Sequence, residues 1–141
     1  MLYADTSAVL PYYRQEAATD AVERMLRAQT TPVLISDLTP VEVACALARW
    51  VRMGELSETQ ANRVESAFFE DVRAGRFARV ALDRGCFERA YHWLLTRRTA
   101  IRTLDALHLA AAQANGATLA TLDNVLLEDA ERLGVDAIRP A

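Results

Sequence analysis

Short apolar runs alternate along the chain with longer segments in which apolar residues recur every three or four positions. A short apolar run is typical of a buried strand, and the longer spacing is typical of a helix with one buried face. The pattern predicts five strands, at Leu2–Ala4, Val33–Ser36, Phe77–Leu82, Ala117–Thr121 and Val135–Ile138. It predicts helices at residues 6–13, 17–29, 40–53, 58–74, 84–98, 103–115 and 125–133.

Strands that alternate with helices favour an α/β fold, in which helices cover both faces of a parallel sheet. No repeat, low-complexity tract or linker rich in Pro, Gly or Ser divides the 141 residues, so we expect one domain spanning residues 1–141. Right-handed crossovers bring the ends of most strands to one rim of such a sheet, where these folds bind their ligands.

Composition excludes several classes of protein. Hydrophobic residues make up 52% of the chain and the net charge is −3, which argues against disorder and against a nucleic-acid polycation. No apolar run has the ~18–20 residues of a membrane span, so we expect no membrane association. All 16 basic residues are Arg, which excludes catalysis by a lysine amine. Two cysteines without a partner spacing, Cys45 and Cys86, fit a reducing cytoplasm.

An acid follows within a few residues of four apolar runs, and two more acids open helices; they are Asp5, Asp37, Asp83, Asp123, Glu42 and Asp105. Asp is a favoured helix N-cap, and capping or turn chemistry alone explains Asp37 and Asp83. The segment Thr39–Glu42 also matches a capping box, with Pro40 at the first helical position. Taken singly, each acid is more readily explained as a cap than as a catalyst.

The positions of four of these acids favour a shared site. If the first strand is central, Asp5 lies in the middle of the rim. Helices that begin near Glu42 and Asp105 then point these acids toward Asp5, and the strand before Asp123 brings that acid to the same place. Four converging carboxylates repel one another unless a cation is present. Hard divalent cations such as Mg²⁺ and Mn²⁺ prefer oxygen ligands. The pattern therefore favours metal-assisted cleavage of a phosphodiester.

Four blocks of the sequence, in this order and spacing, resemble the motifs of PIN-domain ribonucleases, and in particular the VapC-like toxins of type II toxin–antitoxin systems. The blocks are Leu2–Ala8, Thr39–Val43, Leu104–Ala110 and Thr121–Asp123. The resemblance covers essentially the whole chain. Asp-Thr-Ser in the first block is a weak signal alone, whereas the four blocks in sequence are a strong one.

The resemblance implies a three-layer α/β/α sandwich and an endoribonuclease that hydrolyses RNA phosphodiesters with one or two Mg²⁺ or Mn²⁺ ions. It also implies a cognate antitoxin as partner and a homodimer. The implied metal ligands are Asp5, Glu42, Asp105 and Asp123, and the implied hydroxyl groups that steady the carboxylates or a water are those of Thr6, Ser7 and Thr121. Asn124 stands where some relatives have a further acid nearby, which leaves the number of ions open.

Two alternative functions remain open at this point. A haloacid-dehalogenase-like phosphatase also begins with a strand and an Asp, but it needs a second Asp where Ser7 stands, and a lysine. A non-catalytic PIN-type module that binds RNA or protein is expected to have lost part of the acidic quartet, which this chain keeps.

Two further residues lie next to the third acid. His108, one helical turn after Asp105, fits a packed helix position better than contact with a substrate. Arg102, three residues before Asp105, is suited either to grip an RNA phosphate or to remain solvated.

Overall fold

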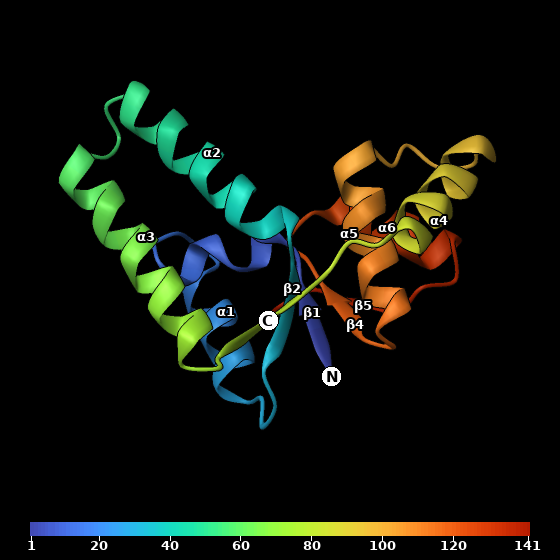
Figure 1. The fold of residues 1–141 in the computed structure, drawn as a ribbon, viewed down its shortest axis with the longest axis horizontal. Helices are drawn as coiled ribbons and strands as arrows, with labels where there is room; N and C mark the ends of the chain where they lie inside the picture. The colour runs from blue at the N-terminus through green and yellow to red at the C-terminus, as the bar shows by residue number, and fades with distance from the viewer.

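A five-stranded parallel sheet runs through the centre of the computed structural model, which describes residues 1–141 (Figure 1). The strands are β1 (Leu2–Ala4), β2 (Val33–Ser36), β3 (Phe77–Val80), β4 (Thr118–Ala120) and β5 (Ala137–Ile138). Their order across the sheet is β3-β2-β1-β4-β5, so the first strand is central. The strands match the five predicted ones, although three of them are shorter than the pattern suggests.

The helices form two groups on opposite sides of the sheet (Figure 1). One group comprises α1 (Thr19–Arg27), α2 (Leu38–Arg52) and α3 (Glu58–Arg73), together with the 3₁₀ turns η1 (Thr6–Ala8) and η2 (Leu10–Tyr12). The other group comprises α4 (Arg84–Leu95), α5 (Thr103–Ala114) and α6 (Asn124–Arg132). The expected three-layer α/β/α arrangement is confirmed.

Each central strand sends alternate side chains into the two helical layers, because successive side chains of a strand point to opposite faces. Tyr3 and Leu119 pack in the core beneath α4, α5 and α6. Their neighbours Ala4 and Ala120 pack in the core beneath α1, α2 and α3. Both faces of the sheet are therefore buried, as the continuous apolar runs of these strands predict.

The helix predicted over residues 6–13 is wrong: this segment forms η1 and η2, two short 3₁₀ turns. Pro11 lies in the second turn, where it lacks the backbone N–H that a continuous α-helix would use. The Asp5 side chain caps the first turn by accepting a hydrogen bond from the N–H of Ala8. The chain leaves the central strand in a tight turn, which keeps Thr6 and Ser7 beside the strand end.

The capping box predicted at the start of α2 is also wrong. The helix begins at Leu38, so Glu42 is too far along it to reach back to the N-cap, and no capping box forms. Thr39 Oγ1 is buried without a hydrogen-bond partner. Asp37 makes no side-chain cap and instead pairs with Arg79, with 2.6 Å between the carboxylate Oδ1 and Nε. Glu42 is thereby left available for contacts elsewhere.

Helices α2 and α3 form a hairpin that extends away from the sheet (Figure 1). A capping box does form at the start of α3, where Ser57 and Gln60 exchange hydrogen bonds. The segment after α3 turns at Gly75, whose φ of 82° favours glycine. No helix in the structure combines the length and the apolar character that a membrane span requires.

Candidate active site

Four acids from four different elements meet at the carboxyl ends of β1 and β4. Asp5 follows β1, Glu42 lies in α2, Asp105 lies in the first turn of α5, and Asp123 caps α6 after β4. Burial raises the pKa of Asp105, and the negative charges of Asp123, Asp5 and Glu42 raise it further, in that order. The other three predicted metal ligands therefore lie within electrostatic range of Asp105.

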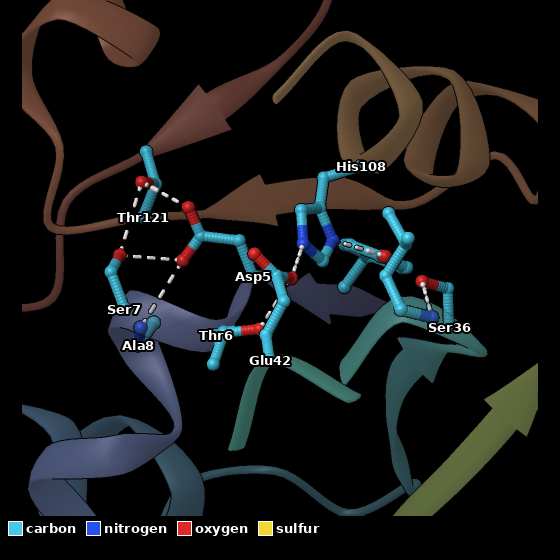
Figure 2. A network of polar contacts seen from close by, with 10 residues as sticks. Asp5, Thr6, Ser7, Ala8, Ser36, Glu42, His108 and Thr121 are labelled. Atoms are coloured by element: carbon cyan, nitrogen blue, oxygen red, sulfur yellow. Dashed lines mark hydrogen bonds and ion pairs between the residues drawn. The ribbon is translucent and has the colours of Figure 1, made fainter. Parts of the chain in front are cut away.

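Asp5 is the most tightly held of the four, and only 5% of its surface is exposed. The Ser7 hydroxyl donates to Oδ1 at 2.6 Å, and the Thr121 hydroxyl donates to Oδ2 at 2.6 Å (Figure 2). The N–H of Ala8 also donates to Oδ1, at 3.1 Å. Burial raises the pKa of this carboxyl and outweighs these hydrogen bonds, which lower it. The carboxylate is thus fixed in orientation from both sides.

The Ser7 and Thr121 hydroxyls also tie the turn after β1 to the loop after β4. Their oxygens lie 3.3 Å apart. Ser7 Oγ accepts a hydrogen bond from the N–H of Leu122 at 3.0 Å, and Thr121 Oγ1 accepts one from the N–H of Asp123 at 3.1 Å. Segments more than 110 residues apart in sequence are therefore joined around Asp5.

Asp123 has two functions in this arrangement. Its Oδ1 accepts hydrogen bonds from the N–H groups of Val125 at 2.8 Å and Leu126 at 3.2 Å, which caps α6. Its charge also acts on Asp105, as the raised pKa of Asp105 shows after the larger effect of burial. The capping and the site interpretations of this acid are compatible.

Glu42 points toward β1 from the second turn of α2. Thr6 Oγ1 donates to its Oε1 at 2.8 Å, and His108 Nε2 contacts the same oxygen (Figure 2). Burial raises the pKa of Glu42, but the hydrogen bonds from His108 and Thr6 outweigh it, so the net shift is downward. Glu42 is thus stabilised as a carboxylate, in contrast to Asp5 and Asp105.

His108 is the residue of this region whose contacts the sequence did not reveal. Its side chain lies on the buried face of α5 with 1% of its surface exposed, as expected. It also links Glu42 to the core. The Tyr3 hydroxyl lies 2.7 Å from Nδ1, while Nε2 contacts Glu42. A buried imidazole among Ala and Leu residues needs polar partners. This need is the feature of the sequence from which the contacts of His108 could have been expected.

A cleft of about 430 Å³ lies between the start of α5 and α6, and Asp105 and Asp123 line it. Arg102 also lines the cleft from the exposed start of α5. Asp129 lines it as well, although only 1% of that residue is exposed and its Oδ2 has no hydrogen-bond partner. Asp129 had not been singled out, because it lies among the charged residues Glu128, Glu131 and Arg132 in the second half of a helix.

The donor set suits a hard divalent cation, since every candidate ligand is a carboxylate oxygen and the charges of neighbouring acids contribute to the raised pKa of Asp105. In the structure, Asp5 directs both oxygens, and Glu42 one oxygen, to protein donors. No group of three or more His, Cys, Asp or Glu side chains is arranged closely enough to hold an ion. Ligation would require these side chains to move from the positions that the structure shows.

Comparison with known proteins matches residues 2–132 to the PIN domain. Ribonuclease VapC3 of Pyrobaculum aerophilum is 30% identical over 130 residues, which span 90% of this chain and 92% of that protein. These matches come from sequence and cover nearly the whole molecule.

Solved structures show the same fold. VapC20 of Mycobacterium tuberculosis, described as a sarcin–ricin loop cleaving toxin, superposes with a TM-score of 0.72 at 16% identity, covering 99% of this chain and 100% of that one. The DNA-bound VapBC of Salmonella typhimurium gives 0.74 at 15% identity and covers 100% of both chains. The match over residues 2–132 and the 30% identity with VapC3 show that the chain belongs to the PIN-domain family.

Proposed function

We propose that this protein is a Mg²⁺- or Mn²⁺-dependent endoribonuclease that hydrolyses RNA phosphodiesters and serves as the toxin of a toxin–antitoxin pair. The observation that carries the proposal is that Asp5, Glu42 and Asp123 lie within electrostatic range of Asp105 near the ends of β1 and β4, with Asp5 held by two hydroxyls. The similarity to a protein named as a VapC ribonuclease supports the same chemistry.

The residues proposed to hold the cation are Asp5, Glu42, Asp105 and Asp123. A bound divalent cation would lower the pKa of a water and neutralise negative charge on the scissile phosphate. Ser7 and Thr121 would keep Asp5 in one orientation during this reaction, because each donates to a different carboxylate oxygen. Thr6 would do the same for Glu42.

Arg102 is proposed to bind the RNA backbone. It lines the cleft that also contains Asp105 and Asp123, and its side chain lies at the exposed start of α5. A guanidinium group can donate two parallel hydrogen bonds to a phosphate, which would bring the scissile bond toward the acids and offset their repulsion of RNA.

Cleavage of total RNA by the purified protein, with and without Mg²⁺, tests the proposal. We expect Mg²⁺-dependent cleavage that Asp5→Asn reduces by at least ~100-fold, since loss of a ligand exceeds the effect of losing a partner of a ligand. Asp37→Asn is the matched control, because Asp37 also follows a strand but pairs with Arg79 outside the site. Undiminished cleavage in excess chelator, or equal activity of Asp5→Asn and wild type, would contradict the proposal.

The proposed partners are a cognate antitoxin and a second copy of the chain. One chain of a VapBC complex has the same fold as this chain over its whole length, which supports pairing with an antitoxin. Helix α4 also exposes Phe87, Tyr91 and Leu95, which follow one another at helical spacing and offer apolar surface to a protein partner.

A further inference from the structure

A line of buried polar groups crosses the core and ends at Glu42. It begins at the N–H of Leu38, the first residue of α2, which donates to Ser36 Oγ at 3.2 Å. The hydroxyl of Tyr3 lies next along the line; burial raises its pKa, and the Ser36 hydroxyl lowers it. The line then passes through the ring of His108 to the Glu42 carboxylate (Figure 2).

The two ends of this line impose the same direction of hydrogen bonding. At one end, the backbone N–H of Leu38 can only donate, so the Ser36 oxygen accepts and the Ser36 hydroxyl remains a donor. At the other end, an ionised carboxylate can only accept, so His108 carries a proton on Nε2. The Tyr3 hydroxyl then donates to the unprotonated Nδ1 across 2.7 Å.

Packing alone does not explain these residues. Ser36, Tyr3 and His108 are at most 1% exposed and come from β2, β1 and α5. Apolar side chains of similar shape would fill the same space without the cost of burying polar groups. His108, at the end of the line, and Thr6, beside it, both donate to Oε1 of Glu42, whereas Oε2 receives no hydrogen bond.

We propose that Tyr3 and His108 are positioning residues for Glu42: they hold Oε1 against the protein and leave Oε2 as the oxygen available to a divalent cation. The inference rests on the proposed function, because Glu42 is a cation ligand only under that proposal. It assigns a role to two buried residues that touch neither the RNA nor the cation. Partners of this kind fix the orientation of a ligand and raise the affinity of its site.

The first test compares Tyr3→Phe with Tyr13→Phe by calorimetric titration with Mg²⁺ alone. Both variants lose a tyrosine hydroxyl that is hydrogen-bonded to another side chain. That of Tyr13 donates to Asp71 at 2.6 Å, away from the site. We expect the affinity of Tyr3→Phe for Mg²⁺ to fall about 10–100-fold. The affinity of Tyr13→Phe should equal that of wild type. If Tyr3→Phe does not fold, Ser36→Ala removes an earlier member of the line and should act in the same direction.

The second test is the position of the ring proton, measured by ¹⁵N NMR at neutral pH without metal. The chain has two histidines, and His92 is exposed, so its ring provides a reference. We expect His108 to be protonated on Nε2 and not on Nδ1. In Tyr3→Phe the ring loses its donor at Nδ1, so a second tautomer should become populated, whereas Tyr13→Phe should leave the spectrum of His108 unchanged.

The outcomes separate the two proposals. A proton on Nδ1 in wild type, or equal Mg²⁺ affinity of Tyr3→Phe and wild type, overturns the positioning role while wild-type binding and cleavage remain intact. A wild-type protein that neither binds Mg²⁺ nor cleaves RNA overturns the proposed function, and with it the role of Tyr3 and His108 toward a cation.

Discussion

At the scale of single residues, Glu42 and Asp105 show how two acids of one site differ. Burial acts on both to raise the pKa. For Glu42, hydrogen bonds from His108 and Thr6 lower the pKa and reverse this shift. For Asp105, the negative charges of Asp123, Asp5 and Glu42 raise the pKa further. Without a cation, the charged form of Glu42 therefore stabilises the fold and the charged form of Asp105 destabilises it.

The two acids should consequently respond to neutralisation with opposite signs in metal-free buffer. The raised pKa of Asp105 means that stability falls as pH rises from about 4, its value in the unfolded chain. Asp105→Asn should then melt above wild type at pH 7, with the difference lost below about pH 4. Glu42→Gln should be less stable by about 1 kcal/mol at pH 7, because it weakens two hydrogen bonds to a charged group.

Melting curves of wild type, Asp105→Asn and Glu42→Gln across pH, with and without Mg²⁺, check this prediction. Mg²⁺ should raise the melting temperature of wild type more than that of either variant, because both lose a proposed ligand. Shifts of the same sign for the two variants in metal-free buffer at pH 7 would show that their surroundings do not differ as described.

The sequence indicated the acids and hydroxyls of the candidate site, but not which of them are hydrogen-bonded to one another. Asp5, Ser7 and Thr121 were grouped by motif, and the structure brings them into contact. The bond between Tyr3 and His108 joins residues 105 positions apart, and no local pattern indicates it. Glu42 was ambiguous because a capping box and a site acid have the same local sequence.

At the scale of elements, α6 contains a feature that works against stability. Asp129 lies in the last turn of this helix, where the helix dipole disfavours an acid. Its side chain is buried, one oxygen has no partner, and Arg132 reaches the other only at 3.5 Å. A buried carboxylate with so little compensation is costly.

Asp129→Ala should therefore stabilise the protein by about 1 kcal/mol, since it removes a buried carboxyl group with one oxygen unpartnered and introduces the best helix former. The expected rise in melting temperature is roughly 4 °C. Glu128→Ala, at the neighbouring exposed position of α6, is the matched control and should change stability by less than about 0.5 kcal/mol. A lower melting temperature for Asp129→Ala would mean that this carboxylate has an unrecognised stabilising contact.

The elements themselves were largely predictable, because each has a clear period and a nearby breaker such as Gly75 or Pro32. The error at residues 6–13 arose because two 3₁₀ turns and one short helix give the same apolar spacing. The start of α2 was misplaced because Thr39 and Pro40 form a favourable helix start that the fold does not use.

At the scale of the whole molecule, strand order explains where the acids meet. From the central β1 the chain goes first to β2 and β3 on one side and later to β4 and β5 on the other. Crossovers that leave in opposite directions create a crevice at the ends of β1 and β4, which is where such sheets bind ligands. Asp5 and Thr121 come from these two strand ends. The sequence indicated alternating strands and helices, but strand order had to be assumed.

The measurement that tests the proposed hydrolysis most directly is analysis of the RNA ends formed in ¹⁸O-labelled water with Mg²⁺. If water attacks phosphorus, its oxygen forms the new P–O bond, one P–O bond to ribose breaks, and the departing oxygen takes a proton. We therefore expect one ¹⁸O in each new terminal phosphate and no 2′,3′-cyclic phosphate. A 2′,3′-cyclic phosphate without ¹⁸O would show that the ribose hydroxyl is the nucleophile, and would contradict hydrolysis by these four acids.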